Sequence, residues 1–387
     1  MKFTLAQNQL AIMQEKSRLY SYLSAEFTKT YFSIGDGYLT IFFHGARGAL
    51  KTQIPVPLSA EEPTKYFQID YGKWLNAVSK LSFADEIVFN LTAKYLKIST
   101  EGSPDSISLG IVSYEEDSSE AFNIRGFIES KKPVVDSSTL TMDKELADAL
   151  LVTNSIFSSA AQNNSVALKK DSVMYADRSI ILKVLVGARD EFLKDRDSVG
   201  IHKFVSGFLL QAMRFNTNFI FDEHYETVYW EDENTKVVVA SERCVIALPT
   251  DEELAMFVPQ EDSERGRFSI GQNSLYESLE FFNGFYEASV WKPITFLCKD
   301  NKVKLYYKHP TTEVSKNLDT AEFSQSMNAE FPIVSELLSK LLQKAIDNSD
   351  SEDVDSQKVT ITYDEEAAGV HCVIGNSYDV VFAKLVQ

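Results

Sequence analysis

Residues 71–81 read YGKWLNAVSKL, and their apolar residues fall at the i, i+3, i+4, i+7 spacing of a helix with one buried face. Trp74, Ala77, Val78 and Leu81 would form that face. The same spacing recurs in HKFVSGFLLQAMR at 202–214 and in PIVSELLSKLLQKA at 332–345, where Pro332 suits a helix's first turn. These three stretches open about 130 residues apart, which predicts a repeated domain.

Three noisier helical patterns open near Ala6, Asp143 and Gln272, roughly midway between the clear ones. Each of the six patterns is followed by short β-type runs. A half-repeat therefore lies within each full repeat. This arrangement predicts three copies of a domain that is itself a duplicated unit of one helix and several strands, and it favours a ring-forming scaffold over an enzyme with a pocket.

Strand-like runs outnumber helices and are mostly consecutive, which predicts antiparallel sheets and an α+β fold. Residues 34–38 (IGDGY) give a hairpin signal. Further runs lie at 87–91, 96–99, 107–113, 173–175, 180–186, 236–240, 303–307 and 359–363. Two polar stretches, 128–138 and 259–267, are typical of linkers, and the acidic stretch 347–357 is typical of a solvated loop. We therefore predict domains at 1–130, 138–260 and 267–387.

Length and charge narrow the class of protein. The chain has 387 residues with 44% hydrophobic content, enough for two or three folded cores, and a net charge of −18. Such acidity argues against a surface that is basic all over, but not against a nucleic-acid partner.

The three cysteines show no metal or disulfide spacing, which indicates a reducing intracellular setting. Neither a signal peptide nor an apolar run of membrane-spanning length is present in the sequence, so we expect no membrane association.

No catalytic constellation stands out in the sequence. The best metal candidate is Asp222-Glu223-His224 with Glu226, which is more simply a solvated turn. The acidic runs 115–117 and 251–253 are interpreted as surface loops. We therefore expect neither an enzyme nor a metal or cofactor site.

Basic residues recur on the polar faces of the helical patterns. Lys73 and Lys80 lie seven residues apart, and Lys340 and Lys344 lie four apart, so each pair shares one face. In an acidic protein, repeated lysines on helices favour one locally positive surface that meets a polyanion. The alternative is an ordinary solvated helix face, and the fifth helix, with Glu277 and no base, weakens the pattern. The DNA-binding candidates are Lys16, Lys73, Lys80, Lys144, Lys203, Arg214, Lys340 and Lys344.

Several segments resemble the bacterial-type DNA polymerase sliding clamp, the β-type processivity factor, in a divergent or phage-encoded form. The resemblance spans the chain through 1–4 (MKFT) with Gln9-Leu10, 114–124, 150–159, 173–184 with Ala176-Asp177, and 379–385. Two stretches depart from the family pattern. Arg178-Ser179-Ile180 replaces its Gly-His-Arg, and 382–387 (FAKLVQ) replaces its terminal Pro-containing stretch.

The resemblance implies three clamp domains, each with two inner helices and outer antiparallel sheets. It implies that two chains close head to tail into a ring that slides on double-stranded DNA without reading its sequence. The implied partners are a DNA polymerase and a clamp loader, in the cytoplasm of a bacterium or an infected host cell. The implied partner-peptide cleft comprises Leu151, Ile180, Leu182, Phe257, Val258, Phe382 and Leu385, and the implied dimer interface comprises Ile107, Leu109, Phe285 and Tyr286.

Two other classes of protein stay open at this point. A non-enzymatic phage assembly or scaffolding protein built of repeated α+β units would explain the acidity and the repetition without a role for the lysines. A checkpoint-type clamp subunit that forms a hetero-ring would explain the same repeat with a different assembly.

Overall fold

The computed structural model describes residues 1–17, 19, 29–58, 63–81, 85–100, 104–133, 136–156, 164–177, 179–240, 244, 248, 251–257, 266–285, 293–309, 312–325, 327–348 and 357–383. The chain forms two compact units. Unit 1 comprises Met1–Met142 and Phe204–Arg243, and unit 2 comprises Asp143–Lys203 and Cys244–Gln387. No helix within the described ranges has the length and apolar character needed to cross a bilayer.

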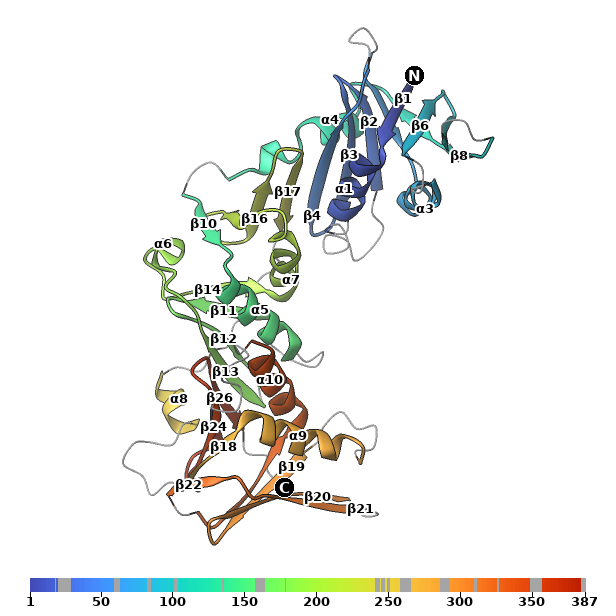
Figure 1. The fold of residues 1–387 in the computed structure, drawn as a ribbon. Helices are drawn as coiled ribbons and strands as arrows, with labels where there is room; N and C mark the ends of the chain where they lie inside the picture. Colours follow the sequence, from blue (N-terminus) through green and yellow to red (C-terminus); the bar gives the residue numbers. More distant parts are fainter. Residues whose placement is uncertain are drawn as a thin grey trace. The chain divides into compact units, whose positions relative to one another are not determined.

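All six helices of the predicted repeat are present (Figure 1). They are α1 (Gln7–Ser17), α3 (Tyr71–Leu81), α5 (Lys144–Ile156), α7 (Lys203–Ala212), α9 (Gln272–Asn283) and α10 (Ser335–Asn348). Short helices that the sequence did not predict are α4 (Ser119–Gly126), η1 (Glu129–Lys131), α6 (Asp190–Leu193) and α8 (Asp251–Phe257). The interpretation of 251–253 as a surface loop was therefore wrong, because these residues begin α8.

Unit 1 contains two antiparallel sheets. The four-stranded sheet has the order β1 (Lys2–Ala6), β6 (Glu86–Leu91), β7 (Tyr95–Thr100), β8 (Ser106–Gly110). The nine-stranded sheet has the order β10 (Ser138–Thr141), β15 (Asn218–Phe221), β16 (Thr227–Glu231), β17 (Thr235–Ala240), β4 (Gly48–Pro55), β3 (Tyr38–Gly45), β2 (Lys29–Gly35), β5 (Lys65–Gln68), β9 (Val112–Tyr114). The predicted strand at 107–113 is thus divided between two sheets.

Unit 2 repeats this plan. Its nine-stranded sheet has the order β14 (Ser198–His202), β11 (Ser165–Lys169), β12 (Ser172–Ala176), β13 (Ile180–Leu185), β26 (Tyr378–Ala383), β25 (Gly369–Ile374), β24 (Lys358–Tyr363), β18 (Gly266–Gly271), β22 (Glu322–Gln325). Its four-stranded sheet has the order β21 (Thr312–Leu318), β20 (Lys302–His309), β19 (Pro293–Lys299), β23 (Ala329–Val334). The predicted α+β class with antiparallel sheets is confirmed.

Each nine-stranded sheet continues across a predicted domain boundary. In unit 1, β17 pairs with β4 and brings Val237 opposite Leu50. In unit 2, β13 pairs with β26 and brings Ile181 opposite Val381. Because backbone hydrogen bonds join strands from different repeats, the compact units do not coincide with the repeats. The division into domains 1–130, 138–260 and 267–387 stays a prediction.

The apolar stripe of 71–81 packs as the sequence predicts. All four stripe residues of α3 are buried, and the Trp74 ring lies 5.0 Å from that of Phe32 and 5.5 Å from that of Phe89. Pro332 does not begin a helix. It lies in β23, an edge strand opposite Thr295, where a residue without an N–H is tolerated. The helix begins three residues later, at Ser335.

The pairing of β4 with β17 depends on Gly48. This glycine has φ +147°, and a Cβ there would lie 2.2 Å from the Val238 carbonyl oxygen. Gly37 also has positive φ, but a Cβ there would meet nothing within 4 Å.

We expect Gly37→Ala to lower the free energy of unfolding by about 1 kcal/mol through backbone strain alone. Gly48→Ala should lower it by at least about 3 kcal/mol, because it also displaces the neighbouring strand. Urea unfolding of the two variants measures the difference. Equal losses would contradict this role of Gly48.

Candidate nucleic-acid interface and partner surfaces

Six of the eight predicted DNA-binding side chains are exposed and one is half-buried. The exposed residues are Lys73, Lys80, Lys144, Lys203, Arg214 and Lys340, and the half-buried one is Lys344. Lys73 and Lys80 share an exposed face of α3 that lies to one side of its buried stripe. Lys203 begins α7, and Arg214 lies two residues beyond the end of that helix.

Lys16 is the exception, and its assignment to DNA was wrong. Its side chain is buried, and its Nζ lies 2.6 Å from the Asp232 carboxylate and 6.0 Å from the centre of the Phe215 ring. Asp232 also accepts hydrogen bonds from the backbone N–H groups of Asn234 and Thr235, so it organises the turn before β17. The pair therefore joins α1 to that turn and leaves no charge for a phosphate.

The two lysines of α10 have acidic neighbours on their own helix. Lys340 Nζ lies 2.8 Å from a carboxylate oxygen of Glu336, and Lys344 Nζ lies 4.0 Å from one of Asp347. Both pairs are partly exposed, so each contributes little to stability. The ion pairs have a larger effect on the electrostatic potential of the surface than on stability, because each carboxylate neutralises the charge of the lysine beside it.

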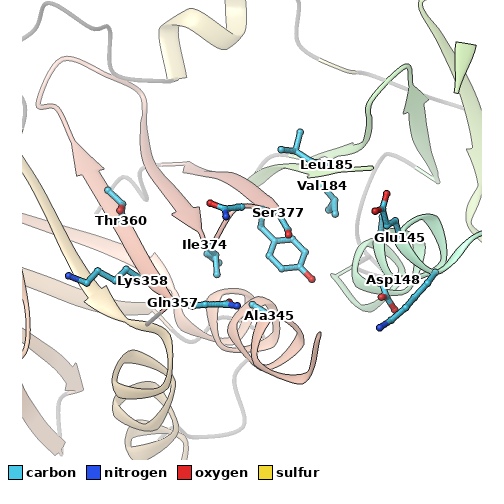
Figure 2. Close-up of a pocket in the computed structure, with 15 residues that line it drawn as sticks. Glu145, Asp148, Val184, Leu185, Ala345, Gln357, Lys358, Thr360, Ile374 and Ser377 are labelled. Carbon is cyan, nitrogen blue, oxygen red and sulfur yellow. The ribbon is translucent and has the colours of Figure 1, made fainter. Parts of the chain in front are cut away.

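A cavity of about 850 Å³ opens in unit 2 beside Lys144 (Figure 2). Its walls come from α5, from Ala345 of α10, from the end of β13, from the start of β24 with Gln357, and from the turn between β25 and β26. Glu145 and Asp148 line it from α5, and a Glu145 carboxylate oxygen accepts a hydrogen bond from the Gly187 N–H at 2.9 Å. Burial raises the pKa of Asp148, while Lys144 and Lys344 oppose that rise. The cavity therefore carries both charge signs, and of the predicted site residues it contains only Lys144.

Three predicted cleft residues prove to be core. Ile180, Leu182 and Phe382 are each at most 1% exposed. Their neighbours on the same paired strands, Ile181 and Val381, point to the other face of the sheet. There they form a cluster with the small or flexible side chains of Ala167, Met174 and Ala176. Side chains alternate along a strand, so the predicted residues and the Ile181 cluster lie on opposite faces of the sheet. The partner-peptide cleft stays a prediction.

Helix α8 covers part of the face that carries the Ile181 cluster. Phe257 and Leu248 pack on the cluster while staying partly exposed, and Met256, which sequence reasoning missed, is 61% exposed. The Ala368 N–H donates to the Met256 carbonyl at 3.0 Å. Gly369 lets the helix approach, since a Cβ there would lie 3.0 Å from the Phe257 carbonyl oxygen. Of the remaining cleft predictions, Leu151 is exposed on α5, whereas Val258 and Leu385 lie outside the described residues.

In unit 1, the corresponding face of the nine-stranded sheet is covered by α4. Helix α4 and the residues after it insert Ala121, Ile124 and Ile128, all at most 2% exposed. The strands beneath contribute Ala49, Val238 and four large rings: Tyr31, Phe42, Tyr66 and Tyr229. The two units thus share an architecture. In each, a short helix lies over a buried apolar cluster with partly buried side chains packed against it: Tyr114, Phe127 and Ile220 in unit 1, and Leu248 and Phe257 in unit 2.

Asp177, from the family-like strand, is fully engaged in its own turn. One carboxylate oxygen accepts hydrogen bonds from the Ser179 N–H and hydroxyl and from the Ile180 N–H at 2.7–3.1 Å. The other accepts one from the Tyr175 hydroxyl at 2.9 Å. The aspartate therefore shapes the turn between β12 and β13. Arg178, the first residue of the departure from the family pattern, lies outside the described residues.

The predicted dimer residues lie next to unpaired sheet edges. Ile107 is half-buried and Leu109 is 8% exposed in β8, an edge strand of unit 1. Phe285, just beyond α9, is 42% exposed, and Tyr286 lies outside the described residues. Sequence reasoning missed Phe281, which lies one helical turn before Phe285. The i, i+4 spacing of these two phenylalanines indicates that their side chains lie on the same face. The two rings lie 5.5 Å apart, and Lys316 of the edge strand β21 lies 5.4 Å from the Phe281 ring.

The described residues contain no group of three acidic, histidine or cysteine side chains that could hold a metal ion. The segment predicted as the best metal candidate forms the turn between β15 and β16. Asp222 there accepts hydrogen bonds from the Glu226 and Thr227 N–H groups. Burial raises the pKa of the Cys298 thiol to about 12, which disfavours the thiolate that metal binding or nucleophilic attack requires.

Comparison with known proteins gives a consistent result at the level of structure only. Neither a protein-family model nor a curated protein sequence matches the chain. Among solved structures, the β subunit of DNA polymerase III from Thermotoga maritima is 13% identical with a TM-score of 0.71, covering 100% of this chain and 99% of that one. The Helicobacter pylori β clamp bound to a DNA ligase peptide is 13% identical with a TM-score of 0.70, and the C. crescentus β sliding clamp is 10% identical with a TM-score of 0.74. Both cover 100% of each chain. Over its whole length, the chain therefore has the fold of the bacterial DNA polymerase III β subunits, the β sliding clamps.

Proposed function

We propose that this protein is a DNA polymerase processivity factor, a sliding clamp that encircles duplex DNA and tethers the polymerase. The observation that carries the proposal is the likeness of the entire chain to entire β subunits at TM-scores of 0.68–0.74. An assembly protein built of repeated α+β units would share the repeat but has no reason to share both the length and the order of all elements. The role is structural rather than catalytic, and it needs no metal or cofactor.

In the proposed assembly, two chains close head to tail through their free sheet edges. β8 of unit 1 and β21 of unit 2 each end a four-stranded sheet, and edge strands present unpaired backbone groups that readily add another strand. Phe281 and Phe285 supply exposed aromatic surface beside β21. Each chain contributes the three proposed domains, so the ring has six.

The proposed partner surface is the apolar face beneath α8 in unit 2. The H. pylori clamp binds a DNA ligase peptide. We infer that a DNA polymerase and a clamp loader reach this protein through comparable short apolar segments. A mixed apolar surface with partly exposed Phe257 and Met256 suits such a ligand. The proposed setting is the cytoplasm in which the DNA is replicated.

Native mass and topology test the proposed function directly. We expect a discrete dimer in native mass spectrometry. Protein that is assembled on nicked circular DNA should stay bound at high salt and should be lost when the circle is linearised, because the ring holds DNA topologically rather than by charge. A monomer or an open polymer, or equal loss from circular and linear DNA, would contradict a sliding clamp.

The ring-closing contact is tested with Phe281→Ala/Phe285→Ala. Removal of two aromatic anchors should weaken dimerisation by about 2 kcal/mol or more, roughly thirty-fold in Kd, measured by sedimentation. Phe122→Ala is the matched control, since Phe122 is an exposed phenylalanine on α4 and 56% exposed. The assignment is wrong if the double variant dimerises as tightly as the control.

The partner surface is tested with Met256→Glu and Phe257→Ala. Each should weaken binding to the replicative polymerase of the same genome at least tenfold in a surface-binding assay, because a charge or a cavity replaces apolar contact. Phe122→Glu, at a 56% exposed phenylalanine of α4 in unit 1, should leave binding unchanged. The dimer mass should be the same for all three. Unaltered polymerase binding by both α8 variants would place the partner surface elsewhere.

A further inference from the structure

The helices of the repeat carry very different charges. α3 contains Lys73 and Lys80 and no acidic residue, a net charge of +2. α9 contains Glu277 and Glu280 and no basic residue, a net charge of −2. The two helices are alike in length and in the burial of one apolar face. Their exposed faces therefore present opposite potentials to a polyanion.

The other helices of unit 2 do not compensate for α9. In α5, Lys144 stands beside Glu145 and Asp148, a net charge of −1. In α10, the two lysines are balanced by Glu336 and Asp347, with which they form ion pairs. Lys344 also lies close enough to influence the pKa of Asp148. Each of the three lysines that the sequence nominates in α5 and α10 therefore has a carboxylate neighbour.

The acidic face of α9 is held in place by its contact with α10. The Ser339 hydroxyl of α10 donates a hydrogen bond to a carboxylate oxygen of Glu280 at 2.7 Å. Both glutamates are exposed. A phosphate backbone that approached Lys340 or Lys344 would also approach Glu280, and like charges so placed repel.

The lysines of α3 stand in a different environment. Both are exposed, and no carboxylate in the described part of the chain forms an ion pair with either side chain. Asp70, just before the helix, accepts a hydrogen bond from the Lys73 backbone N–H at 2.8 Å and so caps the helix. The buried Trp74 face fixes the helix, so both lysines project outward. Seven residues separate them by about 10.5 Å along the helix.

We propose that α3 is the principal phosphate-contacting helix of this protein, through Lys73 and Lys80, and that the acidic face of α9 keeps duplex DNA away from the surface of α9 and α10. The proposal rests on the proposed sliding-clamp function and gives it an uneven inner surface. DNA is then drawn more strongly toward α3 than toward α5, α9 or α10.

The experiment compares two charge-matched double variants, Lys73→Gln/Lys80→Gln and Lys340→Gln/Lys344→Gln. Each removes two positive charges from one helix. We would measure the salt dependence of binding to two unrelated duplexes by fluorescence anisotropy. The α3 variant should lower the magnitude of the log–log slope by about two per chain, and the α10 variant by less than half a unit.

The α9 variant Glu277→Gln/Glu280→Gln should raise the affinity for DNA at low salt. Thermal unfolding and native mass would confirm that all variants fold and dimerise as the wild type does.

The outcomes separate this proposal from the function on which it rests. Equal reductions of the slope by the α3 and α10 variants would overturn the uneven surface while supporting DNA contact. An unchanged affinity of the α9 variant would overturn the repulsive role of Glu277 and Glu280. A wild-type protein that shows no salt-dependent binding and no retention on circular DNA would instead overturn the sliding-clamp function itself.

Discussion

The pairing of β4 with β17 and of β13 with β26 is the constraint on which the rest of the structure depends. Each pairing joins strands from different repeats through an uninterrupted ladder of backbone hydrogen bonds. A sheet edge at these points would expose unpaired N–H and C=O groups. Because the ladders continue across the predicted domain boundaries, the edges of the four-stranded sheets, β8 and β21, become candidates for addition of a second chain.

Each nine-stranded sheet also has an apolar face that a short helix covers, and the side chains in this contact differ between the two units. In unit 1, α4 seals a face of tyrosine and phenylalanine rings with three buried aliphatic residues. In unit 2, the strands present Ala167 and Ala176, and α8 covers them with a side chain that stays partly exposed. Phe257 and Leu248 stay partly exposed, while the cluster residues beneath them are at most 9% exposed. The two covered faces thus differ in the side chains that the strands contribute, which are mainly aromatic in unit 1 and contain no aromatic ring in unit 2.

Periodicity in the sequence predicts the elements well and the faces poorly. The 3.6-residue pattern locates α3 and α10, because burial of one helix face requires that spacing. It fails for Pro332, where an edge strand tolerates the missing N–H that also suits a helix start. The apolar run of β13 does not reveal which side meets α8, since the strand is buried on both faces. Lys16 resembles the other helical lysines in sequence, and only the folded chain brings Asp232 to it.

Under the proposed function, the distribution of ion pairs would allow an acidic protein with a net charge of −18 to hold DNA loosely. The log–log salt slope of DNA binding is about −0.9 for each phosphate that a protein neutralises. If six lysines per chain contacted phosphates without neighbouring acids, a dimer would reach a slope of about −11, typical of a tightly bound protein. If only Lys73 and Lys80 do so, the slope is about −3.6, and binding is easily reversed at physiological salt. A ring that retains DNA by closure needs little affinity and gains mobility from weak contacts. The carboxylates beside Lys144, Lys340 and Lys344 would therefore favour sliding, by removing the charge that would otherwise hold the duplex in one place.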